Sequence, residues 1–213
     1  MRIVCISDTH SMHKDIEQLP EGDVLIHAGD SLRKGGLFEL EDLNDWLGTL
    51  PHPHKILIAG NHDVCFEDTP EKARKVITNA IYLQDSGIRI EGYNFWGSPW
   101  TPRFFDWAFN ADRGQELNEK WQQIPSDTHV LITHGPPVGV RDTVIIQRGE
   151  AQVGCHHLLN RIHHLAHLKA HVFGHIHGGY GTEIRDDGEV RFVNASICTE
   201  WYEPSNLPIV FDL

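Results

Sequence analysis

Histidine and acidic side chains gather in five short polar motifs, and their types point to bound metal ions. These motifs supply seven candidate ligands of imidazole, carboxylate and amide type: Asp8, His10, Asp30, Asn61, His134, His175 and His177. Mg²⁺ and Ca²⁺ prefer oxygen ligands throughout, and the set contains no thiolate. A mixture of imidazole nitrogen and carboxylate oxygen favours Mn²⁺, Fe or Zn²⁺.

The number of candidate ligands predicts two ions. Seven ligands are too many for one tetrahedral ion. Two ions need a shared ligand, and Asp30, which is central in the order of the motifs, is the candidate bridge. Paired ions about 3.5 to 4 Å apart hold the attacking and leaving oxygens of a phosphoryl transfer. The residues therefore point to hydrolysis of a phosphoester.

Each motif directly follows a short apolar run rich in β-branched residues, which predicts a buried strand. The runs cover residues 3–6, 24–28, 56–59, 130–133 and 170–173. In α/β sheets, ligands bind in the crevice beyond the carboxyl ends of parallel strands. We therefore expect the five motifs to meet at one edge of the fold.

Helical patterns lie between these runs. Residues 36–49 carry leucines at helical spacing, and residues 69–80 open with Thr69 as a cap and Pro70 at the first helical position. This alternation of strand and helix predicts an α/β fold.

Antiparallel structure is also expected. Residues 87–96 predict a hairpin around Glu91-Gly92, residues 183–193 predict another around Asp187-Gly188, and residues 208–213 predict a last strand. These segments favour two sheets, or one mixed sheet, between helices.

Composition bounds the remaining possibilities. The chain has 213 residues, and its ordinary globular composition predicts a single domain over residues 1–213. A net charge of -12 disfavours long nucleic acids and anionic membranes as partners. The 4 cysteines show no CxxC spacing, and no apolar stretch is long enough to span a membrane, so we expect a cytoplasmic protein.

A second group of histidines lies within residues 156–167 and raises the question of a separate metal store. Leu158, Ile162, Leu165 and Leu168 form an apolar stripe at helical spacing in the same segment. An amphipathic helix with histidines on its solvated faces is the favoured interpretation.

The ordered motifs DxH, GD, GNHD, a later TH and GHxH resemble those of the calcineurin-like metallophosphoesterases. More narrowly, the segments 97–102, 133–137 and 194–196 resemble the metallophosphoesterase-domain-containing proteins first described in vertebrate brain. The resemblance implies a four-layer αββα sandwich of mixed β-sheets flanked by helices. It also implies that Asp8, His10, Asp30 and His177 hold one ion, and that Asp30, Asn61, His134 and His175 hold the other.

The resemblance further implies a mechanism. Two divalent transition-metal ions, with Mn²⁺ the first choice and Fe or Zn²⁺ as alternatives, would supply a bridging hydroxide as nucleophile. The family assigns His62 the role of protonating the leaving oxygen or stabilising the transition state. Asp63 is the expected orienting partner of His62, because a neighbouring carboxylate favours the protonated ring.

Small phosphodiesters are the expected substrates, and the narrower resemblance suggests cyclic nucleotides. Asn61 and His62 are expected to contact the substrate, and Phe105 or Trp107 is expected to stack on a nucleobase. Three alternatives remain: a phosphomonoesterase, a hydrolase of another nucleotide derivative, and a non-catalytic scaffold of the same fold. The polar motifs themselves have a purely structural alternative as turn and cap residues.

Overall fold

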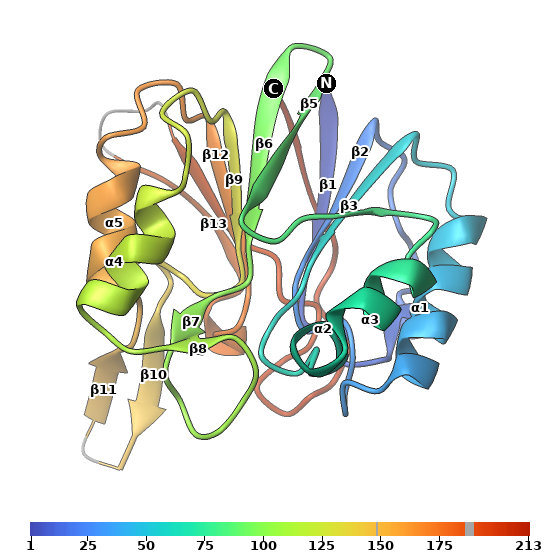
Figure 1. Cartoon of the computed structure of the whole chain (residues 1–213), viewed down its shortest axis with the longest axis horizontal. Helices are drawn as coiled ribbons and strands as arrows, with labels where there is room; N and C mark the ends of the chain where they lie inside the picture. The colour runs from blue at the N-terminus through green and yellow to red at the C-terminus, as the bar shows by residue number, and fades with distance from the viewer. Residues whose placement is uncertain (148, 186–189) are drawn as a thin grey trace.

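The computed structural model describes residues 1–147, 149–185 and 190–213. Two mixed β-sheets face each other, and helices cover both outer faces (Figure 1). The first sheet has the order β15-β1-β2-β3-β4. Its strands are β1 (Arg2–Ile6), β2 (Val24–Ala28), β3 (His54–Ile58), β4 (Ile81–Tyr82) and β15 (Ile209–Asp212). All neighbours are parallel except β15, which runs antiparallel to β1.

The second sheet repeats this plan, with the order β13-β14-β12-β9-β6-β5. Its strands are β5 (Ser86–Ile90), β6 (Tyr93–Ser98), β9 (Val130–Thr133), β12 (Ala170–Phe173), β13 (Gly181–Ile184) and β14 (Arg191–Asn194). The four central strands are parallel, and the edge strands β5 and β13 are antiparallel to their neighbours. Both predicted hairpins are therefore confirmed in their arms, whereas Asp187-Gly188 lies outside the described residues.

Three apolar clusters account for the four layers. On β1, Ile3 and Cys5 point between the sheets, while Val4 and Ile6 point outward, as the period of two along a strand requires. The outer face of the first sheet packs against α1 (Leu37–Thr49), α2 (Cys65–Asp68) and α3 (Pro70–Val76). The outer face of the second sheet packs against α4 (Gln115–Gln122) and α5 (His156–Ile162). The four-layer αββα expectation is confirmed.

The predicted helix over residues 69–80 begins as expected, with Thr69 at the N-cap position and Pro70 as its first residue, but the prediction is too long at the C-terminus. Helix α3 ends at Val76, because the Asn44 side chain accepts hydrogen bonds from the backbone N–H groups of Thr78 and Asn79 at 2.9 and 3.0 Å. These bonds draw the chain onto α1. The hydroxyl of Thr69 does not cap α3 and instead donates to the carbonyl of Cys65 at 3.2 Å.

Smaller elements lie beyond the carboxyl ends of the strands. Two-residue strands β7 (Thr101–Pro102) and β8 (Asn110–Ala111) pair with each other, and β10 (Thr143–Ile146) pairs with β11 (Gly149–Gln152) in a hairpin that extends from the body (Figure 1). Two 3₁₀ turns cover His13–Asp15 and His177–Gly179. Within the described residues, no helix has the length and apolar character needed to cross a membrane.

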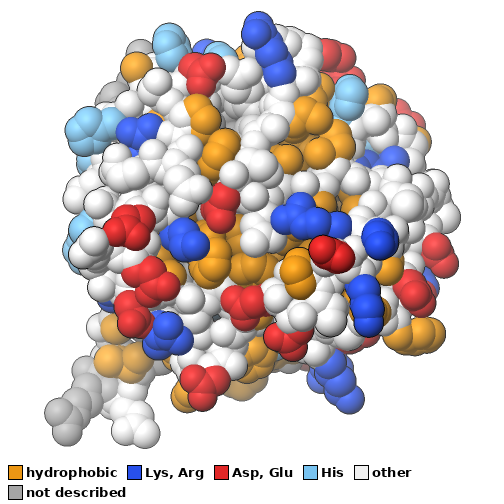
Figure 2. Space-filling view, viewed as in Figure 1, with side chains coloured by type: hydrophobic (Ala, Val, Ile, Leu, Met, Phe, Trp, Pro, Cys, Tyr) orange, Lys and Arg blue, Asp and Glu red, His pale blue; other side chains and the backbone are white. Residues whose placement is uncertain are grey.

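The surface supports the interpretation of the second histidine group. Leu158 and Ile162 of α5 are buried, whereas His156 and His163 are exposed, so the segment is an amphipathic helix. In Figure 2, histidines gather along the left edge of the molecule, the side on which α5 lies, and acidic and basic side chains are mixed over the same face.

Candidate metal centre

The topology explains why distant motifs meet. Asp8 and His10 follow β1, Asp30 follows β2, and Asn61 follows β3 in the first sheet, whereas His134 follows β9 and His175 and His177 follow β12 in the second. Ser7 and Ser196 form an isolated parallel bridge that joins the two sheets at this end. The carboxyl ends of both sets of parallel strands therefore lie at one end of the molecule, at the lower edge of the sheets in Figure 1.

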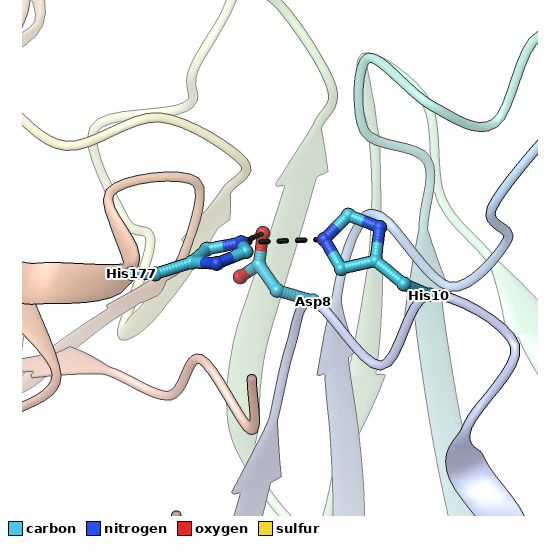
Figure 3. A group of neighbouring side chains, drawn as sticks. All are labelled: Asp8, His10 and His177. Carbon is cyan, nitrogen blue, oxygen red and sulfur yellow. Dashed lines mark hydrogen bonds and ion pairs between the residues drawn. The ribbon is translucent and has the colours of Figure 1, made fainter. Parts of the chain in front are cut away.

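One group of side chains consists of Asp8, His10 and His177, whose ligand atoms lie within 4.8 Å of one another. Nε2 of His177 lies 3.4 Å from Oδ1 of Asp8 and 3.2 Å from Nε2 of His10 (Figure 3). Asp8 is fully buried and accepts hydrogen bonds from the backbone N–H of His175 and from the hydroxyl of Ser196, the latter at 2.8 Å.

A second group consists of Asp30, His134 and His175, again within 4.8 Å of one another. Nε2 of His134 lies 3.3 Å from Oδ1 of Asp30 and 3.1 Å from Oδ1 of Asn61. Asp30 also belongs to a third group with His10 and His62, so it borders both halves of the centre. The structure thus brings all seven predicted ligands together in the two expected sets, with Asp30 between them; their role as ligands stays a prediction.

The orientation of the histidines fits a bound cation. Nδ1 of His177 lies 2.9 Å from the carbonyl of Thr199, and Nδ1 of His134 lies 3.0 Å from the carbonyl of Ala28. A carbonyl only accepts, so each Nδ1 carries the hydrogen and each Nε2 of the neutral ring presents a lone pair to the centre. There the Nε2 lone pairs face carboxylate, amide and imidazole acceptors. Acceptors held this close require a proton or a metal ion between them.

The charges lead to the same conclusion. Asp8 and Asp30 are 0% and 2% exposed, and two buried carboxylates are costly without a compensating cation. Burial opposes a charge on His134, but Asp30 outweighs burial and raises the pKa of His134 to about 9. Burial lowers the pKa of His10 and that of His175 to about 4, which keeps both rings neutral, the form that binds a metal. These donors fit transition-metal ions.

Four of the seven candidate ligands have a positive backbone φ angle. The φ values of Asp8, His10, Asp30 and His175 are 50°, 44°, 50° and 66°. These values lie in the left-handed region, which residues other than glycine seldom occupy. Each such residue costs of order 1–3 kcal/mol, and residues of this kind cluster at functional sites. Four such residues lie around one point of the fold.

Glycines leave the space that the candidate ligands fill. A Cβ at Gly60 would lie 2.3 Å from Oδ1 of Asp30, and a Cβ at Gly174 would lie 2.0 Å from Oδ2 of Asp8. Gly60, after β3, therefore leaves room for the motif after the neighbouring strand β2, and Gly174, after β12, leaves room for the motif after β1 of the other sheet.

His62 lies beside Asp30, but Asp63 is not its orienting partner, and that expectation is wrong. Nε2 of His62 is 4.0 Å from Oδ2 of Asp30, and its Nδ1 is 3.0 Å from the carbonyl of Arg33. The side chain of Asp63 points into the fold, where it accepts hydrogen bonds from Ser31, Leu32 and Gly60. Burial, followed by the charge of Asp30, raises the pKa of Asp63 to about 7. Asp63 therefore fixes the loops and does not touch the centre as a catalytic group would.

The structure distinguishes the two aromatic candidates. The ring of Trp107 contacts His62, with centroids 4.1 Å apart, and the next backbone N–H donates to the carbonyl of Asn61 at 3.2 Å. Phe105 is 71% exposed and its ring packs on Phe104, with centroids 4.4 Å apart. Trp107 thus borders the centre, whereas the ring of Phe105 packs against no candidate ligand among the described residues.

Sequence reasoning missed two side chains of the centre. The ring of Tyr202 lies 4.8 Å from that of His10 and 5.2 Å from that of His177, measured between centroids, and Tyr202 is 45% exposed. Ser196 holds Asp8. Neither residue belongs to a strand-end motif with a histidine or a carboxylate. The segment 194–196 stands out only for its resemblance, and no local pattern singles out Tyr202.

Comparisons with known proteins agree with the motifs and with the fold described above. The family model for calcineurin-like phosphoesterase matches residues 1–179. Metallophosphoesterase domain-containing protein 1 of Homo sapiens is 45% identical over 235 residues, which cover 100% of this chain and 71% of that protein, and the Mus musculus protein gives the same values. A UPF0046 protein of Caenorhabditis elegans is 38% identical over 242 residues, covering 100% of this chain and 60% of that protein. The solved structure of TT1561 of Thermus thermophilus shares the fold, with a TM-score of 0.62 at 13% identity over 96% of this chain and 90% of the other.

Proposed function

The chain belongs to the calcineurin-like phosphoesterase family, and on that premise we propose that it hydrolyses small phosphodiesters at a centre of two divalent metal ions. The family is metal-dependent, and the proposal concerns the number of ions, their identity and the substrate. Mn²⁺ is the first choice of ion, with Fe or Zn²⁺ as alternatives, and the combination of imidazole nitrogen with carboxylate and amide oxygen suits all three.

One observation carries the proposal: when the rings are neutral, the form that binds a metal, acceptor atoms face each other across the centre at hydrogen-bond distance. Nε2 of His177 faces Nε2 of His10 at 3.2 Å in one half, and Nε2 of His134 faces Oδ1 of Asn61 at 3.1 Å in the other. Each half also has a buried carboxylate, and Asp30 lies next to both. Two cations, one in each half, would satisfy this arrangement.

The candidate ligands would hold the ions, and His62 would transfer a proton. Bound ions would supply the acidity that makes water a nucleophile at neutral pH. His62 holds a proton at Nδ1 against the carbonyl of Arg33, and in the doubly protonated ring its second proton is on Nε2, which faces Asp30. That proton is in place to be donated to the leaving oxygen of an ester bound beside Asn61.

A cyclic nucleotide is the proposed substrate class. Trp107 is 38% exposed and lies on His62, so an aromatic base next to the reacting phosphate can stack on a ring that is already positioned. Tyr202 offers a second partly exposed ring beside His10 and His177. The net charge of -12 disfavours long polyanionic substrates. We assign this activity to the cytoplasm, because all 4 cysteines are buried as free thiols.

A substrate panel with reconstituted metal tests the proposal. Metal-free protein is reloaded with Mn²⁺ and assayed on a cyclic nucleotide, a dinucleotide, a generic diester and a phosphomonoester. We expect diester turnover that Asn61→Ala abolishes and that Asn160→Ala, a change at an exposed asparagine on α5, leaves intact. Preference for the monoester would replace the proposed substrate class, and protein that holds two ions but cleaves none of the four esters would favour the scaffold alternative.

A further inference from the structure

The carbonyl of Arg33 determines which nitrogen of His62 carries the proton. It lies 3.0 Å from Nδ1 of His62 and accepts a hydrogen bond from that atom. Because a carbonyl cannot donate, the bond fixes Nδ1–H and directs Nε2 toward the centre. Arg33 belongs to the connection between β2 and α1, so the state of the His62 ring depends on the conformation of that loop.

The loop is held at its start and in its middle by the GNHD segment. Asp63 accepts hydrogen bonds from the backbone N–H of Ser31 at 3.3 Å and of Leu32 at 2.8 Å. Gly35 has φ of +76°, and a Cβ there would lie 2.4 Å from the carbonyl oxygen of His62. The backbone N–H of Cys65 also donates to the carbonyl of Gly35 at 2.9 Å. These contacts place the loop against His62, but none of them binds the peptide unit that contains the Arg33 carbonyl.

Glu39, in the first turn of α1, binds that peptide unit and units on both sides of it. Its carboxylate accepts hydrogen bonds from the backbone N–H groups of Arg33 at 3.3 Å, of Lys34 at 3.0 and 3.2 Å, and of Gly36 at 3.1 Å. The carbonyl of Arg33 and the N–H of Lys34 belong to the same peptide plane, so a bond to one sets the direction of the other. Glu39 thereby aims the carbonyl that His62 uses.

A third contact ties this carboxylate to the loop after β1. The hydroxyl of Ser11 donates to Oε1 of Glu39 at 3.0 Å and accepts from the N–H of Arg33 at 3.1 Å. Burial opposes ionisation of Glu39, but these hydrogen bonds outweigh burial and hold the pKa of its carboxyl below the usual value. The carboxylate is therefore charged at neutral pH, and charged acceptors make the stronger hydrogen bonds.

We propose that Glu39 is a positioning residue for His62: it orients the Lys34 peptide so that the carbonyl of Arg33 keeps the hydrogen of His62 on Nδ1 and leaves Nε2 facing the centre. The catalytic half of this inference rests on the proposed role of His62. The claim that Glu39 keeps the hydrogen of His62 on Nδ1 depends on the structure alone.

A helix cap would use the same bond between Glu39 and Gly36, so the tests must separate positioning from helix stability. Glu116→Ala is the matched control. Glu116 lies in the first turn of α4 and accepts a hydrogen bond from the backbone N–H of Asp112 at 2.6 Å, away from the centre. Both substitutions remove a carboxylate that fixes the chain before a helix, and only one of them reaches His62.

The first test reads the His62 ring directly by ¹⁵N NMR of the histidine side chains in metal-free protein. We expect the wild type and Glu116→Ala to show His62 with hydrogen on Nδ1. Glu39→Ala is expected to show a mixture of the two neutral forms, and Glu39→Gln, which keeps one acceptor oxygen, an intermediate mixture. An unchanged His62 signal in folded Glu39→Ala and Glu39→Gln overturns the proposal, whether or not the protein turns over any ester.

The second test uses leaving groups. A proton donor matters for an alkoxide, as in a cyclic nucleotide, and little for a nitrophenolate. We expect Glu39→Ala to lower kcat about 3- to 10-fold on the cyclic nucleotide, with KM and metal content unchanged, and to have little effect on bis(4-nitrophenyl) phosphate. Glu39→Gln should lose less, and Glu116→Ala nothing.

A double-mutant cycle distinguishes failure of the positioning role of Glu39 from failure of the proposed role of His62. If Glu39 acts through His62, Glu39→Ala has no further effect on kcat in the His62→Ala background. If His62→Ala lowers cyclic-nucleotide turnover but Glu39→Ala multiplies that loss, the positioning role is wrong and the proposed function stands. If His62→Ala changes no rate, the proposed proton donor is wrong, and the catalytic half of the inference fails with it.

Discussion

At Gly174, one added methyl group should weaken metal binding at the candidate centre while the rest of the fold is kept. The backbone there does not need the left-handed region, so alanine adds volume without backbone strain. Its Cβ would lie 2.0 Å from Oδ2 of Asp8 and 2.2 Å from Oγ of Ser7. To restore an ordinary contact of 3.4 Å, the Asp8 carboxylate must move by about 1.4 Å.

That displacement is large compared with the tolerance of a metal site. Ligand distances are held to about 0.2 Å, and loss of a single partner that only orients a ligand costs about 10- to 100-fold in metal affinity. Asp8 cannot move freely, because it is fully buried and bonded to Ser196 and to the N–H of His175. We therefore expect Gly174→Ala to lower the affinity of the ion beside Asp8 by about 100-fold or more. Crowding should cost about 1–3 kcal/mol of stability in addition.

The assay is calorimetric titration of metal-free protein with Mn²⁺, with thermal unfolding measured on the same samples. Gly92→Ala is the matched control, because Gly92 has φ of +92° with nothing within 4 Å of an added Cβ. It should lower stability by about 1–2 kcal/mol through strain and leave both ions bound. A folded Gly174→Ala protein that binds both ions as tightly as the wild type would falsify the placement of Asp8 at a metal.

Three further predictions concern single side chains. His62→Ala should lower kcat on a cyclic nucleotide by about 10²-fold with normal metal content, measured by steady-state kinetics and elemental analysis; unchanged turnover would reject its role. Asp30→Ala should lose metal and activity together, because its carboxylate borders both halves of the centre, and retention of both ions would contradict the bridge. Burial lowers the pKa of His171 to about 3, so the unfolded chain gains a proton below pH 6.5 that the folded chain refuses, and stability present above pH 6.5 is lost as the pH falls. Between pH 6.5 and pH 5 the loss is about 2 kcal/mol, so metal-free His171→Gln should lose that much less than the wild type in urea unfolding.

The local sequence pattern was sufficient to predict the strands that carry the candidate ligands. The apolar runs before Asp8, Asp30, Asn61, His134 and His175 are buried strands, and the neighbouring ones within each sheet run parallel. Once the strands are parallel, the residues after them must share an edge. The meeting of the candidate ligands could therefore be predicted without knowledge of any contact between them.

Contacts between a side chain and a distant backbone group could not be predicted in this way. Asn44 ends α3 early by binding Thr78 and Asn79, and Arg33 replaces Asp63 as the partner of His62. In both cases the deciding group is a backbone N–H or carbonyl. Almost every residue has these groups, so the amino-acid sequence does not show which of them forms the contact. Tyr202 was missed for a related reason, because an exposed aromatic ring has no spacing rule that ties it to His10.

We propose that these seven side chains hold two divalent ions at the carboxyl ends of the two sheets. Anomalous diffraction at the manganese edge, from crystals of protein loaded with Mn²⁺, tests it most directly. We predict two peaks about 3.5 to 4 Å apart, one beside Asp8, His10 and His177, the other beside Asn61, His134 and His175, with Asp30 in contact with both. A single peak, or peaks among the histidines of α5, would contradict it.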